Sequence, residues 1–162
     1  MRLYLVQHGE AVSEDVDPDR PLSDRGRADV ARVAGFLAEA GVSVDRVLHS
    51  GKTRARQTAD AFAAALAPGA VVAQTEGGIA PKDSTDWLAS VAARWTDDVM
   101  VVGHLPFMGR VVSGLIADDE GAGMAAFTPG TVVCLERNDD TGTWTVALMV
   151  GPPLFDRAAS GV

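Results

Sequence analysis

Three short apolar runs, each with a histidine at its carboxyl end, constrain the fold of this chain more than any other feature. They are Leu3 to Val6 followed by His8, Val47 to Ser50 containing His49, and Val99 to Gly103 followed by His104. Runs of this kind are typical of strands that are covered on both faces of a sheet. Ligands in open α/β sheets bind in the crevice outside the carboxyl ends of the strands. The sequence therefore predicts a catalytic site at one edge of a sheet.

Helix-like and strand-like patterns alternate along the rest of the chain. We expect four helices. The first begins at Asp24, with Ser23 as N-cap, and stops at Gly41, and the second runs from Thr53 to Leu66. The third begins after Ser84 as N-cap and carries Trp87 and Trp95, and the fourth runs from about Phe107 to Ile116. A short edge strand is expected at Val71 to Gln74, and a hairpin from Thr131 to Glu136 with Thr143 to Val150. This alternation predicts an α/β fold, a three-layer αβα sandwich whose mixed sheet is mostly parallel.

Composition limits the classes of protein to consider. The chain has 162 residues, 47% of them hydrophobic, so we expect a single domain over residues 1–162 with a loosely ordered tail from about residue 152. A formal net charge of -8 argues against nucleic acid as a partner. We also expect a cytoplasmic protein without a membrane partner, because no run has the length of a membrane span and no secretory signal follows Met1. Cys134, in an apolar run, is expected to be buried.

Basic residues cluster where the second expected helix begins. Ser50, Lys52, Arg54 and Arg56 occupy the turn and the first part of this helix, and backbone amides at a helix N-terminus favour an anion. Side chains two residues apart on a helix diverge, whereas Arg54 shares a face with Thr58, so we expect Arg56 to face solvent. Arg20 lies in the polar loop before the first helix and could fold over the site. The pattern suggests a phosphate ligand.

The residues gathered so far, in this order and spacing, resemble the histidine phosphatase superfamily, and in particular its small SixA-type phosphohistidine phosphatases. The matching segments are Gln7-His8-Gly9-Glu10-Ala11, Arg20-Pro21-Leu22-Ser23 with Arg25-Gly26, Ser50 with Arg54, Gln57 and Thr58, and Gly103-His104-Leu105-Pro106. The resemblance implies a phosphoglycerate mutase-like fold, with His8 as the transiently phosphorylated nucleophile. It further implies that Arg54 and His104 hold the phosphoryl oxygens, that Arg20 assists in substrate binding, and that no metal or cofactor is needed.

The chemistry of these residues agrees with that implication. A neutral imidazole is a competent nucleophile because its unperturbed pKa is about 6.5, and a covalent intermediate splits hydrolysis into two easier steps. A guanidinium offers a planar fork to two phosphoryl oxygens, and a second histidine stabilises charge on the transferring group. We also expect Gln7, Gly9 and Ser50 to take part in phosphate binding.

Two features depart from the superfamily pattern. Gln7 stands where an arginine usually precedes the nucleophile, which removes one charge from the phosphate pocket. The carboxylic acid that protonates the leaving oxygen in larger relatives has only weak candidates here, namely Glu76, Asp83 and Glu10. The lack of a strong acid would suit the P–N bond of phosphohistidine better than an alkyl phosphate ester.

We therefore expect a metal-independent phosphatase that acts on phosphohistidine, with a histidine phosphocarrier or signalling protein as partner. Three alternatives remain open at this point. They are a phosphomonoesterase acting on a small phosphorylated metabolite, a noncatalytic phosphate or phosphoprotein binder suggested by Gln7, and a metal-dependent hydrolase with His8, His49 and His104 as ligands.

Overall fold

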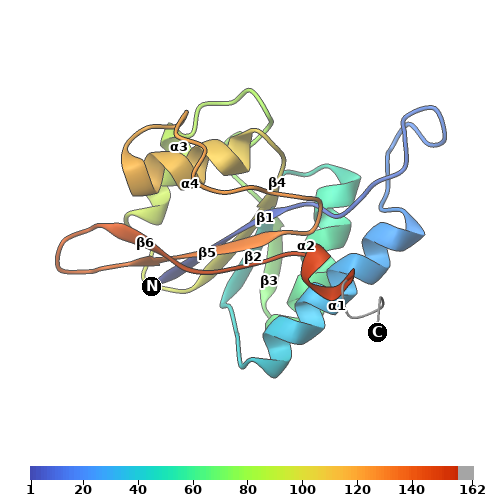
Figure 1. Cartoon of the computed structure of the whole chain (residues 1–162), viewed down its shortest axis with the longest axis horizontal. Helices are drawn as coiled ribbons and strands as arrows, with labels where there is room; N and C mark the ends of the chain where they lie inside the picture. The colour runs from blue at the N-terminus through green and yellow to red at the C-terminus, as the bar shows by residue number, and fades with distance from the viewer. Residues whose placement is uncertain (157–162) are drawn as a thin grey trace.

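Strand β1 (Arg2–Gln7) lies inside a mixed sheet that crosses the middle of the molecule, shown in Figure 1. The computed structural model describes residues 1–156. Within this range the sheet has six strands in the order β3-β2-β4-β1-β5-β6. The other strands are β2 (Arg46–His49), β3 (Val71–Gln74), β4 (Val99–Gly103), β5 (Val132–Arg137) and β6 (Trp144–Val150). The first four strands are parallel, while β5 and β6 pair antiparallel.

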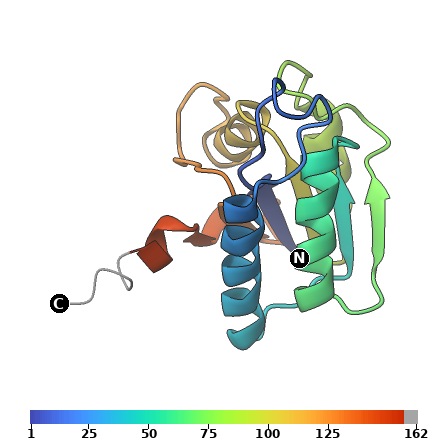
Figure 2. The same ribbon diagram turned by 90° about the vertical axis from the view of Figure 1, so that its right-hand side faces the viewer.

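Helices cover both faces of this sheet, which makes the three expected layers. α1 (Asp24–Glu39) and α2 (Thr53–Leu66) lie side by side on one face, as Figure 2 shows, and α3 (Asp86–Ala92) and α4 (Phe107–Ala117) lie on the other. Alternate residues of β1 supply both cores, because successive side chains of a strand point to opposite faces. Tyr4 and Val6 pack with α1 and α2, whereas Leu3 and Leu5 pack with α4. The expected αβα fold with a mostly parallel sheet is confirmed.

The register of the parallel strands explains where the site forms. Gln7 of β1 lies beside Gly103 of β4, and His49 of β2 lies beside Val102. The carboxyl ends of β1, β4 and β2 therefore meet at one edge of the sheet. Residues that follow these ends, His8 and His104 among them, are brought together by backbone pairing alone.

Most expected element bounds are confirmed, and α3 is the main correction. Its N-cap position is Thr85, not Ser84, although the Ser84 hydroxyl oxygen still accepts the backbone N–H of Asp86, the first residue of the helix, and donates to the Asp86 carboxylate. The helix ends at Ala92, so Trp95 lies beyond it, where the chain turns toward β4. Burial raises the pKa of the Cys134 thiol to about 11, consistent with its expected place in the core.

The end of the chain is described only in part. The tail that we expected to be loose from about residue 152 begins with a short helix, α5 (Pro153–Asp156). The ring of Phe155 lies 5.6 Å from that of Phe36 on α1. Residues 157–162 of the expected tail lie outside the described residues. In residues 1–156 no helix is both long and apolar enough to span a membrane.

Close packing at Gly26 ties helix α1 to the segment that follows His8. The Ser23 hydroxyl caps α1 by accepting the Gly26 N–H, and the Ser23 N–H donates to the carbonyl of Glu10. A Cβ atom at position 26 would lie 2.0 Å from that same Glu10 carbonyl oxygen. Because the obstacle is backbone, only glycine fits at position 26 without moving the segment that carries His8.

Gly26→Ala should lower the free energy of unfolding by about 1–3 kcal/mol, as overpacking does, and should displace the Glu10 segment. Gly35→Ala, on the same helix, is the matched control because a Cβ atom there meets no atom of the described residues within 4 Å. It should raise stability by up to about 1 kcal/mol through helix propensity. Urea unfolding followed by tryptophan fluorescence measures both variants, and equal effects would contradict this account.

Candidate active site

His8 is held in one orientation by contacts to both of its ring nitrogens. Its Nδ1 donates to the carbonyl oxygen of Gly9 at 2.7 Å, and its Nε2 accepts from Nε of Arg54 at 3.2 Å. A carbonyl only accepts and a guanidinium only donates, so the proton sits on Nδ1 and the lone pair on Nε2. The backbone N–H of His8 donates to the carbonyl of Gly103 in β4. The ring therefore presents an unprotonated nitrogen toward an arginine.

His104 completes the pair from the neighbouring strand. Its ring centroid lies 5.0 Å from that of His8, with an angle of 60° between the planes. Its Nε2 shares a hydrogen bond of 2.7 Å with the hydroxyl of Ser50, which follows β2. The structure thus brings His8, Arg54, His104 and Ser50 into one cluster at the edge of the sheet, from three strand ends and a helix.

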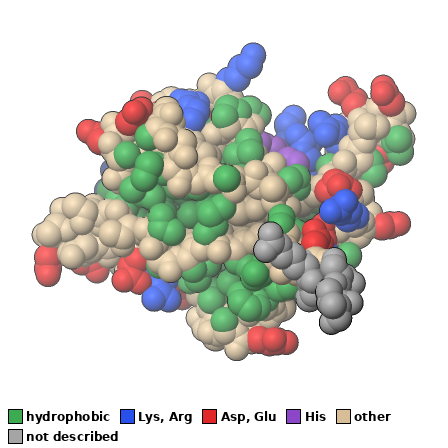
Figure 3. Space-filling view, viewed as in Figure 1, with side chains coloured by type: hydrophobic (Ala, Val, Ile, Leu, Met, Phe, Trp, Pro, Cys, Tyr) green, Lys and Arg blue, Asp and Glu red, His purple; other side chains and the backbone are tan. Residues whose placement is uncertain are grey.

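Burial and positive neighbours keep both imidazoles neutral. Burial lowers the pKa of His8 to about 4, helped by the charges of Arg54 and Arg20. Burial likewise lowers the pKa of His104 to about 4, with smaller contributions from His8, Arg54 and Lys52. Figure 3 shows lysine or arginine side chains gathered beside the histidines on the face in view. A local positive field thus forms on a chain whose net charge is -8.

Sequence reasoning missed how this cluster is supported. Thr58 is fully buried, accepts the Gly9 N–H at 3.0 Å and donates to the Arg54 carbonyl at 2.7 Å. It therefore joins the turn after β1 to the first turn of α2. The N–H of Gly130 donates to the carbonyls of Gln7 and His8. A polar residue on the apolar face of α2 was the available signal for Thr58, whereas nothing near Gly130 marked it.

Arg20 reaches the site through a folded loop. Residues Ala11 and Leu22 form an isolated bridge, and the Leu22 N–H donates to the Gln57 side chain of α2 at 2.7 Å. Arg20 adopts a φ of +48°, which is rare for a residue with a side chain, and its Nε donates to the Val12 carbonyl. Its charge lowers the pKa of both His8 and Arg54.

Gln7 and Gly9, two further predicted phosphate-binding residues, flank His8 in the sequence. The Gly9 N–H is taken by Thr58, so Gly9 acts on the site through the carbonyl that orients His8. The side-chain oxygen of Gln7 is buried and has no hydrogen-bond partner among residues 1–156. Arg56 faces solvent and pairs with Asp60 at 3.8 Å, as expected.

None of the three acid candidates is hydrogen-bonded to the histidine pair within residues 1–156. The Glu10 carboxylate accepts from the Ser23 hydroxyl at 2.7 Å, near the start of α1. The Asp83 carboxylate accepts from the Ala80 N–H in its own loop. Glu76 lines a separate cavity beside Trp87. The role of these three carboxylates as proton donors stays a prediction.

His49 makes different contacts from His8 and His104, which face each other. Its Nδ1 accepts the Gly51 N–H at 3.0 Å and so closes its own turn. Across the part of the chain that the structure describes, no group of 3 or more His, Cys, Asp and Glu side chains is placed to hold a metal ion. The arrangement of three histidines as metal ligands is therefore not formed.

Comparisons with known proteins place this chain in a family. Residues 3–77 match the model of the histidine phosphatase superfamily (branch 1). An uncharacterized protein of Picosynechococcus sp. is 36% identical over 118 residues, covering 68% of this chain and 70% of that protein. Phosphohistidine phosphatase SixA of Escherichia coli is 24% identical over 153 residues, covering 91% of this chain and 94% of that protein. The solved structure of the protein histidine phosphatase SixA complexed with tungstate superposes with a TM-score of 0.83 at 22% identity, covering 96% of this chain and 99% of that one. The chain belongs to the histidine phosphatase superfamily.

The lowered histidine pKa values predict how stability depends on pH. Between about pH 4 and 6.5 the unfolded chain binds protons that the folded His8 and His104 do not. The free energy of unfolding should therefore fall as the pH drops through this window, by up to about 1.4 kcal/mol per pH unit for each histidine. His104→Gln should make this slope shallower in urea unfolding, and a slope equal to that of the wild type would contradict the assignment.

Proposed function

We propose that this protein is a phosphohistidine phosphatase in which His8 Nε2 attacks phosphorus and carries the phosphoryl group transiently. The observation that carries the proposal is the orientation of the His8 ring. Its Nδ1 proton is tied to the Gly9 carbonyl, and its Nε2 lone pair faces the Arg54 guanidinium. A phosphoryl group bound by that guanidinium would lie in front of the lone pair, which is the arrangement needed for attack.

Each step of the reaction balances without a metal or cofactor. The His8 Nε2 lone pair forms a bond to phosphorus while the bond from phosphorus to the substrate's imidazole nitrogen breaks. A substrate ring that carries a proton on its other nitrogen leaves as a neutral imidazole. Water then bonds to phosphorus, the electron pair of the bond to phosphorus returns to His8 Nε2, and phosphate departs with the proton of water passing to solvent. Arg54, His104, Ser50 and Arg20 would bind the phosphoryl oxygens.

The positions of the carboxylates favour a P–N substrate over an ester. An alkoxide leaving group requires a proton donor at the broken bond. The Glu10 carboxylate instead accepts from the Ser23 hydroxyl and the Asp83 carboxylate from the Ala80 N–H, while Glu76 lines the cavity beside Trp87. Because imidazole has a pKa of about 6.5, it leaves readily as a neutral ring. A phosphorylated histidine on a phosphocarrier or signalling protein would supply such a substrate. A small phosphorylated metabolite is the runner-up substrate class.

A second candidate, a protein that binds phosphate without turnover, is favoured by one observation. Gln7 stands where an arginine is usual in the superfamily, and its buried side-chain oxygen has no hydrogen-bond partner in the described part of the chain. Charged donors are stronger than neutral ones, so stabilisation of the transferring group would be weaker than with arginine at this position. Turnover measurements separate the two candidates directly.

Arg54→Ala should lower kcat/KM for dephosphorylation of a phosphohistidine protein by about 100-fold or more, because a charged donor to the transferring group is lost. Arg56→Ala is the matched control, since this side chain lies on the same helix but faces solvent beside Asp60. It should change kcat/KM by less than about twofold. Equal losses in the two variants would contradict the role of Arg54.

Phosphate release by the wild type should also resist a metal chelator and disappear in His8→Ala. Retention of phosphate affinity by His8→Ala, measured by calorimetry, would agree with loss of chemistry at an intact pocket. Release that a chelator abolishes would contradict the metal-free mechanism, and a wild type that binds phosphate but releases none from phosphohistidine would favour the binding protein.

A further inference from the structure

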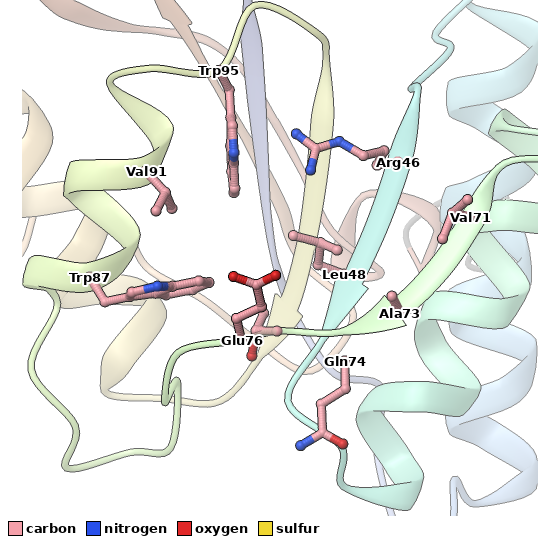
Figure 4. A pocket seen from close by; sticks show the side chains of 10 residues that line it. Arg46, Leu48, Val71, Ala73, Gln74, Glu76, Trp87, Val91 and Trp95 are labelled. Carbon is pink, nitrogen blue, oxygen red and sulfur yellow. The ribbon is translucent and has the colours of Figure 1, made fainter.

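A cavity of about 330 Å³ lies beside β2 and β3, outside the histidine cluster. Figure 4 shows the rings of Trp87 and Trp95 facing this space from the α3 side, with Val91 between them and Leu48 of β2 opposite. Arg46 and Glu76 contribute the charged groups of the lining. Both indoles are partly buried against the core, so their rings are held by packing.

The two charged groups of this cavity differ in their partners. The Arg46 guanidinium lies 5.0 Å from the centroid of the Trp95 ring, and its Nη2 donates to the Asp97 carboxylate at 3.0 Å. The charge of Arg46 is therefore compensated. Glu76, by contrast, makes no hydrogen bond or ion pair with any residue between 1 and 156, and Figure 4 shows its carboxylate pointing into the space beside Trp87. Glu76 is exposed, so the cavity wall carries one solvent-accessible carboxylate beside Trp87 that forms no ion pair with the described residues.

We propose that this cavity binds an alkylammonium group, supplied by a lysine side chain of the phosphorylated protein partner. An ammonium group gains from the Glu76 carboxylate and from the electron-rich ring of Trp87, whereas the Trp95 ring already has the Arg46 guanidinium over it. Its methylene stem fits the apolar wall of Leu48 and Val91. An anionic group would face the unpaired carboxylate, and the net charge of -8 disfavours acidic partners in general.

The cavity adjoins the histidine cluster through the turn after β2. The Thr75 N–H, from the cavity lining, donates to the His49 carbonyl at 3.0 Å, and the Gln74 side chain packs against Gly51. Ser50, between these two contacts, shares its hydrogen bond with His104. A partner whose phosphohistidine enters the site can therefore place a nearby lysine in the cavity. This source of the ligand, but not the binding of an ammonium group, rests on the proposed function.

The binding is tested by two-dimensional NMR of the indole N–H groups of the whole protein. Nα-acetyl-lysine methylamide should shift the Trp87 and Trp95 signals and leave Trp144, which is outside the cavity, unchanged. The same molecule acetylated on its ammonium group should shift none of them. Glu76→Gln should weaken binding about fivefold, whereas Glu39→Gln, at an exposed carboxylate on α1, should leave it unchanged. Equal shifts with the neutral analogue, or equal affinity in Glu76→Gln, would overturn the proposal.

The docking role is tested by turnover of two substrates. Glu76→Gln should raise KM for a phosphohistidine protein that carries a lysine near its phosphorylated residue, and leave phosphate release from an aryl phosphate unchanged. An unchanged KM in an active enzyme would overturn the cavity's role while the proposed function stands. A fall in aryl phosphate release by Glu76→Gln would assign Glu76 to the chemical step, and this result would also overturn the role of the cavity in docking. If the wild type releases phosphate from neither substrate, the proposed function fails and the NMR result alone decides the cavity.

Discussion

Strand β1 is buried on both faces and hydrogen-bonded along both edges, and the site depends on this position. Parallel pairing with β4 on one side and antiparallel pairing with β5 on the other fix its register. Its apolar residues are shared between two cores, so β1 cannot slide without exposing them. His8 follows the last paired residue directly. The position of the proposed nucleophile is therefore set by a strand whose central residues Leu3 to Val6 are buried.

Burial has an electrostatic consequence at this position. An imidazole removed from water and placed near Arg54 and Arg20 stays neutral, and a neutral ring is the form that has a lone pair to donate. The same contacts select which nitrogen keeps that lone pair, because the Gly9 carbonyl accepts only a proton-bearing Nδ1. Thr58 links this turn to Arg54, so the proposed nucleophile and its neighbouring arginine are positioned by one buried hydroxyl. The fold thus fixes both the orientation and the tautomer of the ring, as the proposed attack on phosphorus requires.

Much of this arrangement could be predicted from the sequence because local signals agreed with one another. Continuous apolar runs identified β1, β2 and β4, and the rule that ligands bind at carboxyl ends of parallel strands then gathered His8 and His104. The divergence of Arg54 and Arg56 followed from helical spacing alone. The length of α3 was not predictable in this way, since Trp95 has the spacing of a helical residue but lies where the chain turns into β4. The contacts of Thr58, Gly130 and Glu76 depend on tertiary packing, which periodicity does not encode.

The most direct test of the central claim is to look for the covalent intermediate on His8 itself. The protein is mixed with a phosphohistidine protein, quenched rapidly in alkali, digested and examined by mass spectrometry. The account predicts an acid-labile phosphoryl group on the peptide that contains His8, formed and lost on the timescale of phosphate release. Phosphate release without any phosphoryl group on that peptide, or with the group on another residue, would contradict it.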